Sequence, residues 1–415
     1  MKTVGLIVEY NPFHNGHLYH LQKSKEMTSS DAVVAVMSGN FLQRGEPALL
    51  DKWARAEMAL ANGCDLVIEL PAAYATQAAE WFAFGAVSLL QATGVVDSFC
   101  FGTESGNIKP LETAARIVAN EPEDFKALLQ QLLQAGASYP NAYSSAIKQY
   151  LLHCGDLDAA QFSFDMPNHT LGLHYLTALR RINGTMKPYT IAREKSQYND
   201  TSAQDGTIAS ATAIRKMLLE QQDLQAIKGY IPEATFQIIE KHWRNRHCPM
   251  DWERFRSQLL HKLLTTPIHE LASIHEITEG LEYRIHHMLQ ANTFSTVEEM
   301  LSALKTKRYT RTKLQRALLA ILLGHRKKDF EAKRLAEGVT YIRVLGFTEK
   351  GRSLLRRMRK EATLPVLMSA ARPKQLTDFL ELDIRASHVY ELAKPASEAR
   401  IQLYRDYREK PIIAP

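Results

Sequence analysis

The first part of the chain alternates between short apolar runs and stretches with helical spacing. Apolar runs of five to seven residues that end at Gly, Pro or Asn are typical of buried strands. They predict strands over Val4–Tyr10, Ala32–Met37, Asp65–Leu70, Asp97–Gly102 and Pro188–Ala192. The stretches between them predict helices over 16–27, 51–62, 78–92, 110–160 and 167–182. Apolar strands joined by helices favour an α/β fold in which a parallel sheet is covered on both faces.

Beyond residue 235 the pattern changes to one that is mainly helical. The breaking triplet Tyr230-Ile231-Pro232 comes just before this change, and strand-like runs return only at Tyr341–Leu345 and Pro365–Leu367. Helical spacing extends over 251–265, 278–292, 296–306, 310–324 and 350–361. We therefore expect an α/β domain over residues 1–235 and a mainly α-helical region over residues 236–415. Because no low-complexity linker separates them, we expect the two parts to pack together.

Composition narrows the class of protein. The chain has 415 residues, of which 45% are apolar and 23% charged, as in ordinary folded proteins. No apolar run reaches the roughly 18 residues of a membrane span, and the first apolar run ends at Glu9 without a cleavage pattern. The four cysteines, Cys64, Cys100, Cys154 and Cys248, form no CxxC pair. We therefore expect neither a zinc site nor a disulfide framework, and a cytoplasmic location without a membrane partner.

Positive charge is concentrated in one segment. Residues 301–360 contain 18 Lys and Arg against 4 Asp and Glu, a net charge of +14, whereas the rest of the chain has 33 against 41, or −8. This asymmetry favours a polyanionic partner, with a solvated helix face as the alternative. The cations would neutralise the backbone phosphates of a nucleic acid, and the tyrosine among them would stack on an unpaired base. The candidate nucleic-acid-binding residues are Lys305, Lys307, Arg308, Tyr309, Arg311, Lys313, Arg316, Arg352 and Arg356.

The segment Asn11-Pro12-Phe13-His14-Asn15-Gly16-His17 follows the first predicted strand and opens the first predicted helix. An anion at this place meets unpaired backbone N–H groups and the positive end of the helix dipole. Gly16 lets the backbone approach a phosphate closely, because it has no Cβ. His14 and His17 are three residues apart, so both imidazoles can face the same side and donate hydrogen bonds to phosphate oxygens. The pattern predicts a phosphate-binding site.

A second segment, Ile208–Arg215, has hydroxyl residues at the start of a predicted helix and an arginine one turn later. Such groups suit the β- and γ-phosphates of ATP. Together the two segments resemble the HxGH motif and the late I-S-S-T-x-I-R motif of the nucleotidylyltransferase superfamily. That resemblance implies a Rossmann-like fold that forms an adenylate from ATP and releases diphosphate. Because Ala209 and Ala211 replace serines of the pattern, either Ser210 or Thr212 could contact phosphate.

The whole chain resembles one family within this superfamily, the bacterial tRNA(Met) cytidine acetate ligases. The resemblance is carried, in order, by VGLIVEYNPFHNGH, SGNFLQRGEPA, GCDLVIELP, SFCFGTES, PNHTLG and KTKRYTRTKLQRALLAILLG. It implies a nucleotidyltransferase-like domain followed by helices that engage tRNA. It further implies activation of acetate by ATP as acetyl-adenylate. The acetyl group would then pass to the N4 amine of the wobble cytidine of elongator tRNA(Met), giving N4-acetylcytidine, AMP and diphosphate.

The family's site residues carry over as follows. The implied ATP-binding residues are Ile7, Asn11, Pro12, Phe13, His14, Gly16, His17, His20, Gly102, Asn168 and Arg193. The implied catalytic residues are His14, His17, Ser210, Thr212 and Arg215. Glu9, Arg44, Lys52 and Glu104 could line the pocket as well, or form buried ion pairs. Mg²⁺ is expected with ATP, held mainly by phosphates and water, since no acidic cluster stands out.

Three alternative functions remain open. A small-molecule adenylyltransferase of the same superfamily would typically be shorter and would not need the +14 segment. A tRNA-binding scaffold would bind ATP without turnover. A fragment of a class I aminoacyl-tRNA synthetase is the third, for which Glu194-Lys195-Ser196 gives a faint match to the lysine-serine loop. The sequence leaves the oligomeric state open.

Overall fold

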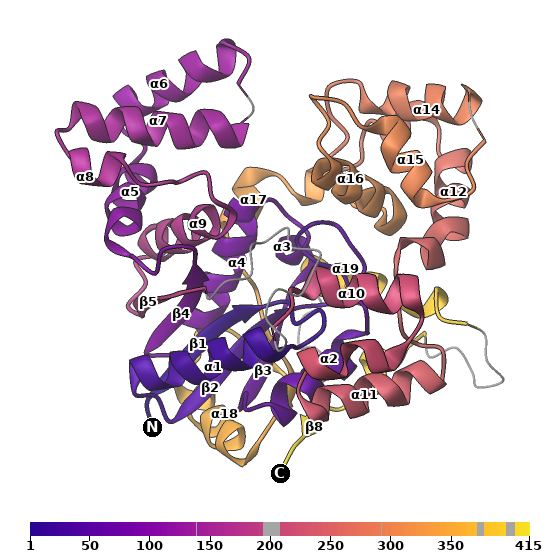
Figure 1. Ribbon diagram of the computed structural model, residues 1–415, viewed down its shortest axis with the longest axis horizontal. Helices are drawn as coiled ribbons and strands as arrows, with labels where there is room; N and C mark the ends of the chain where they lie inside the picture. Colours follow the sequence, from indigo (N-terminus) through magenta and orange to yellow (C-terminus); the bar gives the residue numbers. More distant parts are fainter. Residues whose placement is uncertain (138, 194–207, 292, 372–376, 396–402) are drawn as a thin grey trace.

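The computed structural model describes residues 1–137, 139–193, 208–291, 293–371, 377–395 and 403–415. Glu194-Lys195-Ser196 lies outside these residues. The described strands form one sheet in the order β5-β4-β1-β2-β3-β6-β7, with β8 paired to β6 (Figure 1). The strands are β1 (Thr3–Val8), β2 (Ala32–Ser38), β3 (Leu66–Leu70), β4 (Ser98–Thr103), β5 (Lys187–Ala192), β6 (Ile342–Phe347), β7 (Val366–Leu367) and β8 (Ile412–Ile413). The first five strands are parallel to one another, which confirms the predicted α/β class.

Helices cover both faces of the sheet, and β2 shows why its sequence is apolar throughout. Val34 and Val36 belong to one hydrophobic core, Val33 and Ala35 belong to a second one, and all four are fully buried. The first core includes α4 (Ala79–Ala92), α5 (Lys109–Asn120) and α9 (Pro167–Arg181). The second includes α1 (Asn15–Thr28), α2 (Lys52–Ala61), α10 (Ala211–Gln221) and α11 (Glu233–Arg244).

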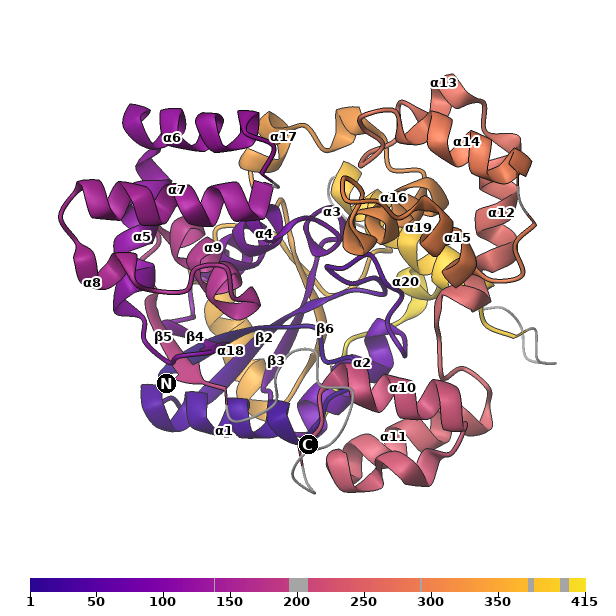
Figure 2. The same cartoon turned by 45° about the horizontal axis from the view of Figure 1, so that its top comes forward.

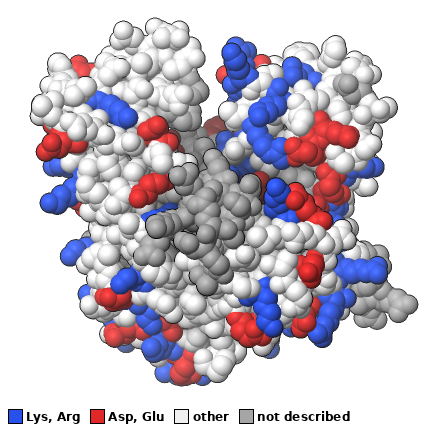
Figure 3. All heavy atoms as spheres, viewed as in Figure 1, with Lys and Arg blue, Asp and Glu red and all other residues white. Residues whose placement is uncertain are grey.

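Two groups of helices rise from the sheet on opposite sides, as Figures 1 and 2 show. The first group consists of α6 (Glu123–Gln134), α7 (Tyr139–His153) and α8 (Leu157–Ala160). The second has a hydrophobic core of its own. It contains α12 (Arg256–Thr265), α13 (Ile268–Leu271), α14 (Leu281–Ala291), α15 (Val297–Leu304) and α16 (Arg311–Leu323), which pack with α19 (Asp378–Leu392). The molecular surface is hollowed between the two groups (Figure 3).

After the second group the chain returns to the sheet. β6 pairs antiparallel with β3, with Leu66 opposite Phe347 and Glu69 opposite Arg343. The strand-like runs predicted at Tyr341–Leu345 and Pro365–Leu367 therefore correspond to β6 and β7, but the sequence pattern did not indicate that they extend the sheet. The sheet thus draws strands from both sides of the boundary predicted at residue 235.

The remaining described helices are short or lie at the edges of these layers. They are α3 (Ala72–Ala75), α17 (Ala332–Ala336), α18 (Glu349–Glu361) and α20 (Arg405–Arg408), with the 3-10 turns η1 (Leu224–Tyr230), η2 (Trp252–Phe255) and η3 (Lys327–Asp329). None of the helices in the described ranges is long and apolar enough to cross a membrane. All four cysteines are free thiols.

A buried ionic cluster joins α2, β3, β6 and α20. The Lys52 ammonium is 2.8 Å from Glu69 Oε1 and 2.6 Å from Asp406 Oδ1, and Arg343 pairs with both carboxylates. Each of the four side chains is at most 3% exposed, so removal of one partner would leave an opposite charge buried. Of the two roles open to Lys52, the structure places it in this buried ion-pair cluster.

Candidate active site

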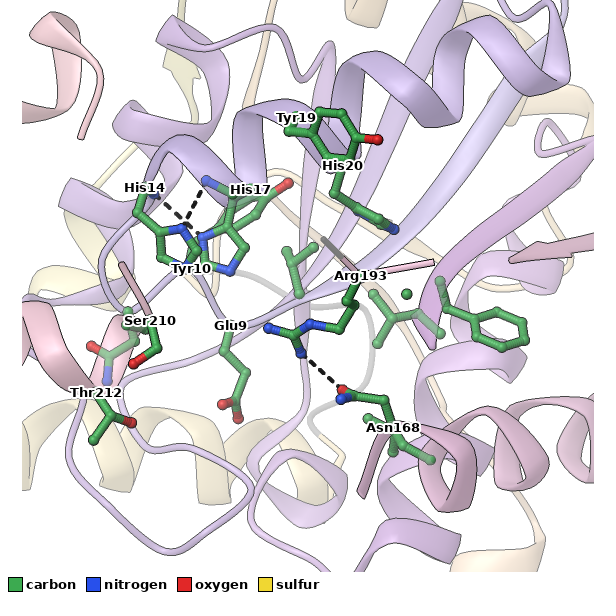
Figure 4. Close-up of a pocket in the computed structure, with 18 of the residues that line it drawn as sticks. Glu9, Tyr10, His14, His17, Tyr19, His20, Asn168, Arg193, Ser210 and Thr212 are labelled. Atoms are coloured by element: carbon green, nitrogen blue, oxygen red, sulfur yellow. Dashed lines mark hydrogen bonds between the residues drawn. The ribbon is translucent and has the colours of Figure 1, made fainter. Parts of the chain in front are cut away.

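A cavity of about 290 Å³ lies at the carboxyl ends of β1, β4 and β5, beside the first turns of α1 and α10 (Figure 4). Open α/β sheets bind ligands at this edge. The structure brings most of the predicted residues together here. They are Ile7, Asn11, His14, Gly16, His17, His20, Gly102, Asn168, Arg193, Ser210, Thr212 and Arg215, and Glu9 and Arg44 line the same cavity.

The first turn of α1 orients the two imidazoles of the HxGH segment. His14 is the N-cap of α1, and its Nδ1 accepts a hydrogen bond of 3.1 Å from the Gly16 N–H. The Nδ1 of His17 accepts one of 3.4 Å from the His14 N–H. The two rings stack with their centroids 3.7 Å apart. Because Nδ1 is the acceptor in both rings, the neutral imidazoles carry their protons on Nε2, as groups that can donate to a phosphate.

Burial and nearby cations keep these imidazoles neutral. Burial, together with the charges of Arg193 and Arg215, lowers the pKa of His14 to about 3. Burial, His14 and Arg193 lower the pKa of His17 well below its usual value, although the Pro12 backbone opposes this shift. Burial and Arg193 lower the pKa of His20 to about 4. A bound phosphate would raise all three pKa values, because it favours the charged form.

The start of α10 lies on another side of the cavity. Ser210 is its N-cap, and the Ser210 Oγ accepts a hydrogen bond of 3.1 Å from the Ala213 N–H. Arg215 Nη2 lies 3.4 Å from Thr212 Oγ1, and Arg215 Nη1 donates to the Asn11 carbonyl over 3.0 Å. Two helix N-termini and a guanidinium therefore meet at one place, which suits a polyanion.

Arg193 is positioned by a chain of hydrogen bonds. Its Nη1 donates to Asn168 Oδ1 over 2.9 Å, and Asn168 Nδ2 donates to Glu104 Oε1 over 2.7 Å. The Glu104 carboxylate also accepts the N–H groups of Asn168 and His169, so it caps the start of α9. Burial alone would raise the pKa of Glu104, but the hydrogen bonds from Asn168 hold that pKa below its usual value. Glu104 thus lies behind the cavity wall.

Close approach accounts for the two predicted glycines. A Cβ on Gly102 would lie 3.2 Å from Arg193 Cγ, and a Cβ on Gly16 would lie 2.9 Å from His14 Cε1. Any larger residue would therefore crowd a side chain of the cavity wall.

Two residues of the implied ATP set, Pro12 and Phe13, are not among the residues that line the cavity. Phe13 is fully buried, with its ring centroid 4.6 Å from that of Tyr10 and 5.8 Å from that of His17. It supports the imidazole from behind.

Several wall residues were missed by the sequence reasoning. They are Leu42, Glu46, Phe101, Leu171, Tyr175, Ile191 and Ala192. Val8, Tyr10 and Tyr19 also line the cavity and lie within the stretch Ile7 to His20 that the resemblance implies for ATP, and Ile208 and Ala211 lie within the second motif. A signal existed for some of the missed residues. Leu171 and Tyr175 follow Asn168 at helical spacing on α9, and Leu42 and Glu46 lie within the string SGNFLQRGEPA. Aromatic and aliphatic side chains on this wall offer a surface for a nucleotide base.

The described residues of the cavity do not form a ready-made metal site. Within the described ranges, no three His, Cys, Asp or Glu side chains converge as metal ligands. Glu9 Oε1 accepts the Gln43 N–H over 2.8 Å, and Glu46 Oε1 accepts from Gln315 Nε2 over 2.9 Å. Burial raises the pKa of Glu9. The two carboxylates of the wall are thus engaged in other contacts.

The candidate RNA-binding residues divide into two separate surfaces. Lys305, Lys307 and Arg308 are exposed and come just before α16. Helix α16 lies beside the hollow (Figure 1), where Figure 3 shows a band of basic side chains. In contrast, Arg352 and Arg356 belong to α18, which lies at the amino ends of the parallel strands. Its Arg357 and Lys350 donate to the carbonyls of Met1 and Asp31, which come just before β1 and β2. That edge of the sheet is opposite to the cavity.

Acidic partners and burial limit some of these candidates. Arg308 lies 3.7 Å from Glu279, Arg311 2.5 Å from Glu298 and Arg316 2.7 Å from Glu276, while Lys313 Nζ donates to Thr278 Oγ1. Tyr309 is only 6% exposed, and its hydroxyl donates to the Glu279 carbonyl. The predicted stacking of Tyr309 on a base is therefore wrong, because its ring belongs to the hydrophobic core of the helices around it.

Paired imidazoles between two helix N-termini, at the carboxyl ends of parallel strands, define a site of the nucleotidyl-transfer class. The family described as HIGH Nucleotidyl Transferase matches residues 1–405. The tRNA(Met) cytidine acetate ligase of Clostridium novyi (strain NT) is 38% identical over 413 residues, which cover 99% of each chain. The corresponding protein of Acetivibrio thermocellus is 41% identical over 407 residues, which cover 94% of each.

Solved structures agree with this assignment. Thermotoga maritima TmcAL in its apo form has a TM-score of 0.92 and 36% sequence identity, covering 100% of this chain and 99% of that one. The same protein bound with alpha-thio ATP has a TM-score of 0.91 over the same shares. The chain belongs to the tRNA(Met) cytidine acetate ligase family of HIGH nucleotidyl transferases.

Proposed function

We propose that the protein forms acetyl-adenylate from ATP and acetate and then acetylates the N4 amine of the wobble cytidine of elongator tRNA(Met), in the cytoplasm. The products are N4-acetylcytidine, AMP and diphosphate. The observation that carries the proposal is the convergence of two helix N-termini, two stacked imidazoles and two arginines on one cavity. The names of the relatives and the ATP analogue bound to the Thermotoga protein support it.

In the first step, an acetate oxygen attacks the α-phosphorus of ATP in line. The bond from that phosphorus to the bridging oxygen breaks, and diphosphate leaves. Catalysis then depends on positioning and on the stabilisation of charge. In this proposal His14 and His17 donate their Nε2 protons in hydrogen bonds to phosphate oxygens. Arg215 and the α10 turn that carries Ser210 and Thr212 hold the leaving diphosphate.

The adenosine part is proposed to lie on the other side of the cavity. Phe101, Leu171 and Tyr175 offer apolar surface there, and Gly102 leaves room at the end of β4. Arg193 is held by Asn168 and balances phosphate charge. If Mg²⁺ accompanies the nucleotide, it would be held mainly by phosphates and water and would neutralise phosphate charge, since no cluster of metal ligands is present among the described residues.

In the second step, the cytidine N4 attacks the acetyl carbonyl carbon, the mixed anhydride C–O bond breaks, AMP leaves and the amine loses a proton. No covalent enzyme intermediate is needed. We propose that the anticodon arm lies against the basic residues just before and along α16, beside the hollow in Figure 3. These residues are Lys305, Lys307, Arg308, Arg311, Lys313 and Arg316.

The test is to incubate the protein with ATP, Mg²⁺, isotope-labelled acetate and unmodified elongator tRNA(Met), and then to weigh the nucleosides of the digested RNA. We expect ATP-dependent label in N4-acetylcytidine, with AMP formed in equal amount. Binding of ATP and tRNA without any label would instead support a scaffold. Transfer of the adenylyl group to a mononucleotide acceptor, with release of diphosphate and without RNA, would support a small-molecule adenylyltransferase. Aminoacylation of tRNA would support a synthetase fragment.

A further inference from the structure

We propose that Glu46 is a positioning residue that couples the RNA-facing helix α16 to the phosphate-binding Arg215, so that bound tRNA tightens the binding of ATP. The inference rests on the proposed function, because it assigns ATP to the cavity and tRNA to α16. Its starting point is the contact between the loop that follows β2 and both of these elements.

The loop that carries Glu46 is compact and packs directly on α16. The Leu42 N–H donates to the Glu46 carbonyl, and the Gly45 N–H donates to the Leu42 carbonyl, each over 2.9 Å. Gly45 has a φ of +77°, and a Cβ there would lie 2.5 Å from the Arg316 backbone nitrogen. The tip of the loop therefore touches the helix backbone, while its residues Leu42, Arg44 and Glu46 line the cavity. A displacement of α16 would be passed to the loop.

The Glu46 carboxylate contacts both sites at once. Its Oε1 accepts a hydrogen bond of 2.9 Å from Gln315 Nε2, which belongs to α16. Its Oε2 lies 3.5 Å from Arg215 Nη2, which belongs to α10. Gln315 is 3% exposed, so its amide has a defined place in the packed helix. One side chain thus joins the basic helix to the arginine that faces the phosphates.

The polyphosphate of ATP and the Glu46 carboxylate compete for the same guanidinium. The ion pair with Glu46 opposes ATP binding, because Arg215 has to exchange one anion for another. In this proposal, bound RNA fixes the position of α16. The hydrogen bond from Gln315 to Glu46 Oε1 is then maintained, and the Glu46 carboxylate stays beside α16 and away from Arg215. Arg215 is then available to the phosphates. Coupling between two ligands is reciprocal, so ATP would tighten tRNA binding by the same factor.

The experiment measures the dissociation constant of ATP by calorimetry, with and without saturating unmodified elongator tRNA(Met), in the absence of acetate. For the unmodified protein we expect tRNA to tighten ATP binding by about fivefold or more. Glu46→Gln should bind ATP more tightly without tRNA and lose most of the response to tRNA. Gln315→Ala leaves the carboxylate to Arg215, so without tRNA it should bind ATP no more tightly than the unmodified protein, and it should show the same loss of response.

Glu298→Gln is the matched control, because Glu298 also pairs with an arginine of α16 but has no contact with the cavity. It should keep the coupling. An unmodified protein that binds both ligands independently would overturn the inference, as would variants at positions 46 and 315 that respond like Glu298→Gln. Failure of tRNA to bind at all would overturn the proposed function and this inference with it. If the unmodified protein showed the effect of tRNA on ATP binding but did not acetylate the tRNA, only the proposed function would be overturned.

Discussion

His14 uses its two ring nitrogens for different purposes. Nδ1 accepts the Gly16 N–H and so caps α1, which leaves Nε2 as the donor that faces the cavity. Burial and two arginines lower its pKa to about 3, so the ring is neutral at pH 7 and keeps this tautomer. Helix capping and phosphate binding can therefore be separated by substitution.

Asparagine and glutamine each retain one of the two functions at position 14. His14→Asn can accept the Gly16 N–H but cannot reach the phosphates. We expect it to keep its melting temperature and to lose about 10²-fold to 10³-fold in kcat for adenylate formation. His14→Gln can reach the phosphates but not the cap, so it should retain more activity and lose about 1 kcal/mol in the free energy of unfolding. Diphosphate release and thermal melts would show this, and the opposite ranking would contradict the tautomer.

Gly102 controls the room beside Arg193. A Cβ there would lie 3.2 Å from Arg193 Cγ and 4.0 Å from His20 Cδ2. We expect Gly102→Ala to weaken ATP binding modestly and Gly102→Val to weaken it by roughly tenfold or more, since the added methyl groups crowd the site and overpacking costs about 1 to 3 kcal/mol. Calorimetry with ATP, beside a melt that reports intact folding, makes the comparison. Equal ATP affinity in both variants would place the nucleotide elsewhere.

The sequence allowed prediction of the site residues whose position depends only on neighbouring residues in the chain. His14, Gly16, His17 and Arg215 belong to motifs in which a strand end or helix start is readable from neighbouring residues. Tyr309 was assigned wrongly because its charged neighbours in the sequence suggest an exposed position. Its ring is in fact buried by helices that are distant along the chain. Glu46 was missed for the same reason, since its partners Gln315 and Arg215 are far away in sequence.

At the scale of elements, α16 and α18 carry the two groups of basic residues at different edges of the molecule. Lys305 and Lys307, just before α16, are exposed, and no ion pair involving either is present in the described part of the chain. Arg352 and Arg356 belong to α18, at the amino ends of the strands. Only the first group lies on the side that faces the hollow (Figure 3).

Salt dependence of tRNA binding distinguishes the two groups. A Lys305→Ala, Lys307→Ala double variant should weaken binding and reduce the slope of log K against log salt concentration by about one to two, because each phosphate contact contributes roughly 0.7 to 1. The Arg352→Ala, Arg356→Ala double variant is the control, and its slope should stay unchanged. Filter binding at several KCl concentrations measures both. A larger change in the control would move the RNA to the other edge.

Elements were easier to predict than their partners. The strands β1 to β5 and their helices follow from apolar runs and periodicity, so the α/β class could be read directly. The run at Tyr341–Leu345 was readable as a strand, but its pairing with β3 was not. Pairing between segments this far apart is decided by packing over the whole molecule, which leaves no local pattern.

At the scale of the whole molecule, buried imidazoles make stability depend on pH. Burial lowers the pKa of five histidines to about 3 or 4, namely His14, His20, His174, His242 and His325. In the unfolded chain they would titrate near pH 6.5. Below that pH the unfolded state binds more protons, so stability falls as pH decreases from 6.5 towards 4. Burial raises the pKa of Asp383 to about 7 and also raises the pKa values of Glu9 and Glu391, and these carboxyl groups act in the opposite direction.

We therefore expect the melting temperature to fall between pH 7 and pH 5, by roughly 5 °C or more. Differential scanning calorimetry in buffers of matched ionic strength measures the change. Saturating ATP should reduce the fall, because phosphates raise the pKa of the imidazoles that they contact. A melting temperature that is constant or higher at pH 5 would show that the imidazoles are protonated in the folded protein.

The position of β6 has a consequence for how the molecule is made. Synthesis proceeds from the amino end, so β3 leaves the ribosome with its outer edge unpaired and waits for almost the whole chain before β6 covers it. An open apolar strand edge can recruit strands of other chains. A nascent chain released near residue 235 would contain both phosphate-binding segments and still lack the strand that closes its sheet. Premature termination should therefore yield aggregates and not a smaller enzyme. Shielding by chaperones would matter most while the helices α12 to α16 are being translated, before β6 is made.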